Sequence, residues 1–152
     1  MMILDSIDKK ILEMLVKDAR TPYSKIAYQL KVSESTIYLR VKKLMEHGIL
    51  KGFHADIDRS KVGFKVLAFI MVKTLPGRYV EVLKKISEIP NVLEVYEITG
   101  EFSGLVKVIA KNQEELASII DTIGNVEGVS DTNTVFVLRV IKEEKNVPIS
   151  LI

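Results

Sequence analysis

Residues 21–48, TPYSKIAYQLKVSESTIYLRVKKLMEHG, determine how the amino-terminal third of this chain folds. The stretch predicts two short amphipathic helices joined by a tight turn. Thr21 is a suitable N-cap, and Pro22 fits the first helical position because no N–H is needed there. Ser33 is a suitable N-cap for the second helix, and Gly48 is a natural stop after it.

Apolar residues recur at helical spacing and predict a core of three helices. In the first helix of the pair they are Ile26, Ala27 and Leu30, and in the second Ile37, Val41, Leu44 and Met45. An upstream helix, beginning near Asp5 with Asp8 as its capping-box partner, adds Ile7, Ile11, Leu12 and Leu15. Helices this short are not stable singly, so we expect the three to close one small core.

The second helix of the pair turns a hydroxyl-rich and basic face away from that core. At about 100° per residue, this face carries Ser35, Thr36, Leu39, Lys42, Lys43 and Glu46, with Tyr38 and Arg40 on its flanks. Lys and Arg neutralise phosphates, Ser and Thr reach phosphates or base edges, and a leucine can touch a thymine methyl. This layout indicates a recognition helix for the major groove of DNA. The plainer interpretation is an ordinary solvated face.

Composition narrows the class of protein. Residues 1–60 carry 11 Lys and Arg against 8 Asp and Glu, whereas residues 61–152 carry 11 against 12. With no cysteine and only His47 and His54, we expect no metal site and no cofactor. The sequence shows no signal peptide and no apolar run able to span a bilayer, so we expect a cytoplasmic protein without a membrane partner.

The rest of the chain predicts a second domain. Residues 49–58 alternate loosely and suggest a strand, or wing, and residues 59–65 suggest a hinge. Strands are then predicted at 66–74, 92–99, 105–110 and 135–141, and helices at 78–89 and 113–123. The predicted fold class is α+β, with a three-helix winged helix-turn-helix domain at 1–58 and a ferredoxin-like βαββαβ sandwich at 66–152.

The first and last of these strands are apolar on both faces. Leu67, Phe69 and Met71 oppose Ala68, Ile70 and Val72 in the first, and Val135, Val137 and Ile141 oppose Phe136, Leu138 and Val140 in the last. Two helices cover only one face of a sheet, so the other face needs a second cover. A second copy of the chain would give a two-fold dimer that presents two recognition helices about one DNA turn (~34–36 Å) apart, suited to a palindromic operator. The alternative cover is the amino-terminal domain.

These features together resemble the leucine-responsive regulator/AsnC family of transcription factors, also called feast/famine regulators. The resemblance rests on LDSIDKKIL at 4–12, VSESTIYLRVKKLMEHGIL at 32–50 and FSGLVKVIAKN at 102–112, and it covers essentially the whole chain. It implies a winged DNA-binding domain followed by a ligand-sensing domain that forms a homodimer through its sheet. It also implies an assembly of four dimers, with an amino acid or related metabolite bound between dimers.

The resemblance assigns site residues by position. The family's DNA contacts fall on Ser35, Thr36, Tyr38, Leu39, Arg40, Lys42 and Lys43, and its effector pocket falls on Gly100, Glu101, Phe102, Ser103, Thr132 and Thr134. The family loop usually has an aspartate where this chain has Ser103, and a hydroxyl cannot supply the charge that pairs with a ligand's ammonium group. Three interpretations stay open: Glu101 substitutes for the aspartate, the ligand differs, or the loop binds no ligand.

Three classes of function compete. An enzyme is disfavoured because Ser103 has no histidine near it in sequence, and Gly100–Gly104 lacks the Lys-Ser/Thr of a phosphate loop. A sequence-specific transcriptional regulator accounts for both domains. The alternatives are an architectural DNA-binding protein without sequence preference and a metabolite-binding oligomer without an operator. A regulator should prefer its site by ~10³-fold or more.

Overall fold

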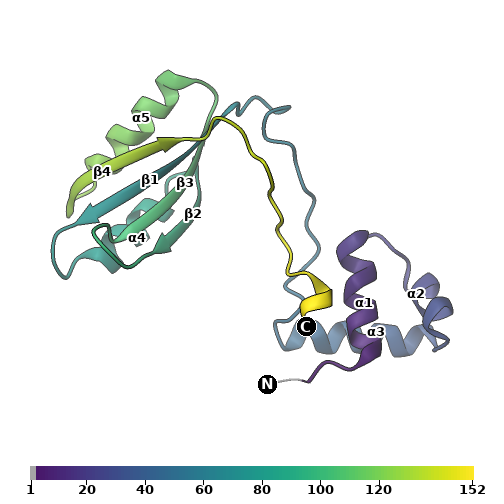
Figure 1. The fold of residues 1–152 in the computed structure, drawn as a ribbon. Coiled ribbons are helices and arrows are strands. Elements are labelled where there is room, and N and C mark those ends of the chain that lie inside the picture. Colours follow the sequence, from purple (N-terminus) through teal and green to yellow (C-terminus); the bar gives the residue numbers. More distant parts are fainter. Residues whose placement is uncertain (1–2) are drawn as a thin grey trace. The chain divides into compact units, whose positions relative to one another are not determined.

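The computed structural model describes residues 3–152 and divides the chain into two compact units. The first unit comprises the residues up to Asp56 together with Lys142–Ile152, and the second is Ile57–Ile141 (Figure 1). The predicted boundaries placed residues 142–152 in the carboxy-terminal domain, whereas the structure groups them with the amino-terminal helices. The first unit is therefore built from two separate stretches of sequence.

The first unit contains the three predicted helices, α1 (Ser6–Lys17), α2 (Tyr23–Leu30) and α3 (Glu34–Glu46). Their predicted common core is confirmed, and its fully buried members are Ile11, Ile26, Ile37 and Leu44. Close packing of three apolar stripes supplies the stability that the helices lack individually.

Three local predictions for this unit are wrong. Pro22 rather than Thr21 is the N-cap of α2, because the Thr21 hydroxyl instead donates to a backbone carbonyl of the preceding turn, at 2.8 Å. Met45 is exposed, since it lies at the edge of the apolar stripe of α3. Residues 49–58 form no strand, because the described part of this unit offers no strand with which they could pair.

The carboxy-terminal residues complete the first unit. The 3-10 helix η1 (Ile149–Leu151) lies against α1, and Ile149 packs against the three-helix core. Lys145 also forms an ion pair with Asp56. The carboxy-terminal segment therefore covers part of α1 and is fastened at two points.

The second unit is a four-stranded sheet with two helices. Its strands are β1 (Val66–Thr74), β2 (Val92–Glu97), β3 (Gly104–Ala110) and β4 (Val129–Phe136), and its helices are α4 (Tyr79–Ser87) and α5 (Gln113–Gly124). All neighbouring strands are antiparallel, in the order β2-β3-β1-β4. Both helices cover the same face of the sheet (Figure 1). The predicted βαββαβ order is confirmed.

The core of the second unit lies between that face and the helices. Ala68, Ile70 and Val72 point inward from β1, and all three are fully buried. A Cβ added at Gly104 would lie 2.3 Å from Cδ2 of Leu83 on α4. A side chain at this position would therefore require the buried Leu83 side chain to shift.

The last strand does not lie where the sequence predicted it, at 135–141. β4 ends at Phe136, which pairs with Ala68 near the start of β1, and only the Val137 N–H continues the ladder, donating to the Leu67 carbonyl at 2.9 Å. Beyond this point only Val66 of β1 is left, because β1 begins there. Residues 130–134 of β4 read SDTNT and are all polar. A search for alternating apolar residues therefore could not identify this part of the strand.

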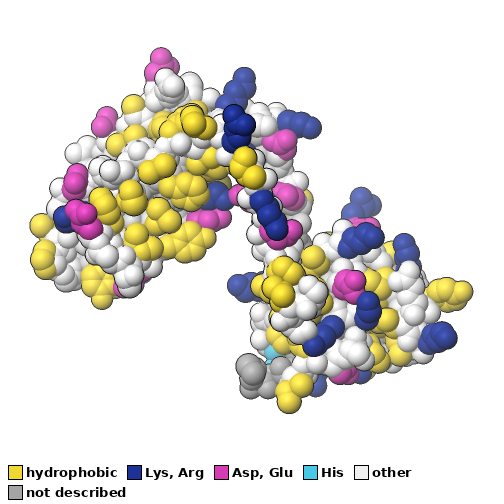
Figure 2. All heavy atoms as spheres, in the orientation of Figure 1, with side chains coloured by type: hydrophobic (Ala, Val, Ile, Leu, Met, Phe, Trp, Pro, Cys, Tyr) yellow, Lys and Arg dark blue, Asp and Glu magenta, His cyan; other side chains and the backbone are white. Residues whose placement is uncertain are grey.

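The other face of the sheet lies away from the helices. Leu67, Phe69 and Met71 of β1 lie on it, opposite Ala68, Ile70 and Val72 as the alternation predicted. The strand registers place further apolar residues beside them: Leu105, Ile109, Tyr96 and Val135. Figure 2 shows hydrophobic side chains gathered over this sheet. Lys107 and Glu94, paired at 3.3 Å, are charged residues within this surface, and Lys73 and Asp131, which pair across β1 and β4, lie at its end. We call this surface the open sheet face.

Candidate DNA interface and effector loop

α3 is fixed at both ends by local sequence. The Ser33 hydroxyl accepts the Thr36 N–H at 3.1 Å and lies within 2.9 Å of the Ser35 hydroxyl and 2.7 Å of the Thr36 hydroxyl. Lys31 adopts a left-handed conformation (φ 56°) in the turn before it, and Gly48 adopts one (φ 67°) after it. These features confirm the predicted cap and stop, and they define where the helix presents its first turn.

The outer face of α3 carries the predicted DNA-contacting side chains. Tyr38 is 58% exposed and Leu39 is 62% exposed, whereas Ile37 between α3 and its neighbours is fully buried. Ser35, Lys42 and Lys43 are also exposed, and Thr36 is half-buried. A single helix face thus offers hydroxyl, aromatic, apolar and cationic groups. That mixture can meet both the phosphates and the base edges of a duplex.

Arg40 differs from the other predicted contacts because its guanidinium is already bound within the protein. Its Nη1 donates to Asp5 Oδ2 at 2.7 Å and to Asp8 Oδ1 at 2.8 Å, both at the amino-terminal end of α1. The backbone N–H of Asp8, and then Arg40, hold the pKa of Asp5 below its usual range. Sequence reasoning identified Asp5 and Asp8 as a capping box but gave no sign that Arg40 joins them.

The predicted effector loop connects β2 to β3 and is anchored to the end of β1. The Ser103 N–H donates to the Val72 carbonyl at 2.9 Å, and the hydroxyls of Ser103 and Thr74 lie 2.9 Å apart. Glu101 Oε1 lies 3.3 Å from Lys73 Nζ; the Glu101 side chain is exposed and the Lys73 side chain is half-buried. Lys73 and Thr74 were not among the predicted site residues, since only the folded sheet brings them to the loop.

The two predicted threonines lie across β1 from this loop. Val72 pairs with Gly104 on one side and with Thr132 on the other, so Thr132 lies at the same end of the sheet as Ser103. Thr134 pairs with Ile70, closer to the middle of the strand. Directly paired residues project to the same face, so both threonines lie on the helix-covered side of the edge strand β4.

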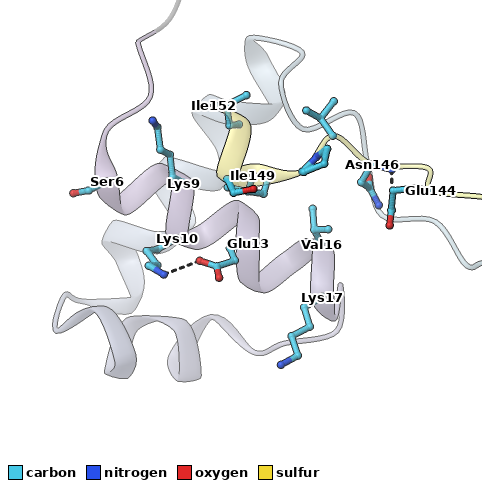
Figure 3. A pocket seen from close by; sticks show the side chains of 13 residues that line it. Ser6, Lys9, Lys10, Glu13, Val16, Lys17, Glu144, Asn146, Ile149 and Ile152 are labelled. Carbon is cyan, nitrogen blue, oxygen red and sulfur yellow. Dashed lines mark hydrogen bonds and ion pairs between the residues drawn. The ribbon is translucent and has the colours of Figure 1, made fainter.

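A cavity of about 720 Å³ lies elsewhere, in the first unit. Figure 3 shows it between α1, with Lys9, Glu13 and Val16, and the carboxy-terminal segment, with Asn146 and Ile149. None of the predicted effector residues lines it. Within residues 3–152, no cluster of three or more His, Asp or Glu side chains could hold a metal ion, and no helix is long and apolar enough to cross a membrane.

Both units match known domains. Residues 4–45 match the AsnC-type helix-turn-helix domain, and residues 67–147 match the Lrp/AsnC ligand binding domain. The chain belongs to the Lrp/AsnC family of transcriptional regulators. A Lrp/AsnC regulator is not an enzyme, and its helix-turn-helix domain binds DNA.

Curated Lrp/AsnC relatives align along almost the whole length of this chain. The transcriptional regulator FL11 of Pyrococcus furiosus is 44% identical over 147 residues, which are 97% of each chain. The regulator LysM of Saccharolobus solfataricus is 42% identical over 137 residues, 90% of this chain and 94% of its own.

Solved structures of the family share the fold. Escherichia coli AsnC superposes with a TM-score of 0.92 at 31% identity, covering 97% of this chain and 100% of its own. A transcriptional regulator from Neisseria meningitidis, solved as a complex with L-Met, superposes with a TM-score of 0.90 at 26% identity, covering 98% and 99%.

Proposed function

We propose that this Lrp/AsnC regulator recognises a specific palindromic DNA site by inserting α3 into the major groove. The observation that carries the proposal is the outer face of α3, where Tyr38, Leu39, Lys42 and Lys43 are exposed on a helix whose other side is buried. The cations supply affinity that does not depend on sequence, and Ser35 and Leu39 supply groups able to discriminate base edges.

Selection of binding sites from a random duplex library, with the purified protein at near-physiological salt, tests this proposal. A regulator should enrich a palindrome whose half-sites lie about one DNA turn apart, preferred by ~10³-fold or more over random duplex. Salt-sensitive binding without enrichment would contradict the proposal and favour an architectural DNA protein. No binding at all would place the function with the ligand binding domain.

We further propose that the open sheet face forms the homodimer. Phe69, Met71 and Val135 remain partly exposed there, and an apolar surface of this extent favours burial against another protein surface. A two-fold axis through this face would supply the second α3 that a palindrome requires. Association of four such dimers is the assembly that the family resemblance implies, and light scattering at several protein concentrations would give the mass.

We also propose that a small metabolite, of the amino-acid class, binds near Ser103. The ligand binding domain and the L-Met complex of the Neisseria relative support a ligand at this domain. In this chain Ser103 supplies no charge, and the carboxylate of Glu101 already pairs with Lys73 at 3.3 Å. An amino acid's ammonium group would therefore compete with Lys73 for Glu101, while its carboxylate could pair with the released Lys73.

Thermal-shift and calorimetric titrations with the twenty common L-amino acids test the effector proposal. The Ser103→Asp variant is the informative comparison, because a carboxylate at this position should tighten binding of any ligand with an ammonium group. Ser118→Asp, which adds the same charge at an exposed serine on α5 outside the predicted pocket, serves as the matched control. Identical titrations of the wild type and Ser103→Asp with every amino acid would contradict the assignment of the site.

A further inference from the structure

Arg40 closes a reciprocal hydrogen-bond arrangement at the start of α1. Asp5 accepts the Asp8 N–H with Oδ1 at 2.8 Å, and Asp8 accepts the Asp5 N–H with Oδ2 at 3.2 Å. Each carboxylate therefore uses one oxygen for the capping box. The remaining two oxygens, Asp5 Oδ2 and Asp8 Oδ1, both accept from Arg40 Nη1. All four carboxylate oxygens are occupied, and α3 is tied to the first turn of α1.

The burial of Asp8 makes this arrangement costly to break. Asp8 is 3% exposed and is the buried charged residue of the described core, and the Arg40 side chain is 28% exposed. If Arg40 swung out toward a phosphate, the Asp8 carboxylate would stay buried without its cation. Leaving a buried charge unpaired is strongly destabilising. The ion pairs of Arg40 with Asp5 and Asp8 should therefore persist when DNA binds.

The charges around Arg40 also disfavour a contact with phosphate. One guanidinium faces two carboxylates, so the cluster carries a net negative charge, and a phosphate approaching Arg40 would also approach Asp5, which is half exposed. By contrast, Lys43 has no carboxylate among its side-chain partners in the described structure, and Lys42 has only Glu46 at 3.8 Å. The lysines are the groups free to neutralise phosphates.

We infer that Arg40 is a positioning residue: it fixes the orientation of α3 on α1 through Asp5 and Asp8 and makes no phosphate contact. The inference rests on the proposed operator recognition by α3. On this inference, the ion pairs of Arg40 on the flank of α3 determine how Tyr38 and Leu39 enter the groove, although the helical pattern of the sequence assigned Arg40 to DNA contact.

The test uses variants for which the two roles of Arg40 predict opposite signs. Asp5→Asn keeps the N-cap, since Asn caps as well as Asp, but weakens the hold on Arg40. If Arg40 positions α3, Asp5→Asn should lose about fivefold or more in operator affinity while affinity for random duplex stays constant. If Arg40 contacts phosphate, removing a neighbouring negative charge should tighten binding to every duplex. Glu13→Gln is the matched control, because it removes one exposed negative charge from α1 without touching Arg40.

Arg40→Met gives a second, independent measurement. A positioning role predicts that the slope of log affinity against log salt concentration equals that of the wild type, with a loss confined to the operator. A phosphate contact predicts a slope that is shallower by ~0.9. A shallower slope, tighter binding by Asp5→Asn, or an Arg40→Met protein with unchanged operator affinity would each overturn the inference.

Folding and specificity are separated within the same experiment. Circular dichroism at the assay temperature establishes that each variant is folded, and Asp5→Asn alone carries the test if Arg40→Met is unfolded. Arg40→Lys keeps the charge but cannot bridge the two carboxylates in the same geometry, so it should restore operator affinity only in part. If the wild type itself shows no sequence preference, the proposed function fails. The salt slopes of wild type and Arg40→Met on random duplex then still decide whether Arg40 contacts phosphate.

Discussion

Replacing Lys42 by alanine tests the phosphate contact predicted for α3. Lys42 is exposed, and its Nζ lies 3.8 Å from Glu46 Oε1, a surface ion pair that contributes about 0–1 kcal/mol to stability. The free energy of unfolding should therefore change little. Any loss of affinity in this variant then reports on the interaction with DNA rather than on the fold.

The size of the effect follows from counterion release. One lost phosphate contact should make the slope of log affinity against log salt concentration shallower by ~0.9. Between about 50 and 200 mM salt, the advantage of the wild type over Lys42→Ala should then shrink about 3.5-fold. Because every sequence has the same phosphates, the loss at a given salt concentration should be equal for operator and random duplex.

Fluorescence anisotropy titrations of both duplexes at four salt concentrations measure these slopes. Lys84→Ala is the control, since Lys84 is an exposed lysine on α4 of the second unit and its removal changes the net charge equally. Parallel lines for wild type and Lys42→Ala would refute the phosphate contact. A loss seen only with the operator would show that Lys42 reads bases instead.

Three further outcomes are expected. Ser33→Ala should lower the free energy of unfolding of the first unit by ~1 kcal/mol in urea titrations, because it removes the N-cap of α3, while Ser33→Asp should be nearly neutral. The pKa of Asp5 is lowered, mainly by the Asp8 N–H, so its stabilising effect is complete above ~pH 4 and is lost as the pH falls further; an equal acid loss in Asp5→Asn would contradict this. Phe69→Asp should yield monomers by light scattering, whereas Val80→Asp, an exposed apolar position on α4, should leave the dimer intact. A dimeric Phe69→Asp protein would rule out the open sheet face as the interface.

Sequence periodicity predicted the elements that bury a single regular stripe. β1 was predicted at its observed bounds, 66–74, because it is a continuous apolar run, and α5 within one residue, because its apolar residues recur at helical spacing. Sequence periodicity failed where pairing with another strand decides whether a segment is a strand. Residues 49–58 alternate in sequence yet pair with no strand among residues 3–152, whereas β4 is polar in its first half and is a strand because β1 lies beside it.

The residues of the candidate site likewise fall into a predictable and an unpredictable group. The outer face of α3 could be predicted because one helix's geometry determines it. The partners of Arg40 could not, since Asp5 and Asp8 lie 35 and 32 residues earlier and meet Arg40 only when α1 and α3 pack. The contact of Ser103 with Thr74, 29 residues away, depends likewise on the register of the sheet.

The placement of residues 142–152 in the first unit has a consequence for how this protein can be divided or recombined. If gene segments of two relatives were joined at a single point in the hinge, the carboxy-terminal segment of one relative would pack on α1 of the other. The residue at position 149, which packs on the three-helix core, would then come from a different protein than the core. Two contacts join the stretches of the first unit: Asp56 with Lys145, and α1 with the segment that contains Ile149. A substitution on one side of either contact therefore calls for a compatible residue on the other side. The two stretches of the first unit thus depend on each other in the fold, although the sheet and helices of the second unit separate them in the sequence.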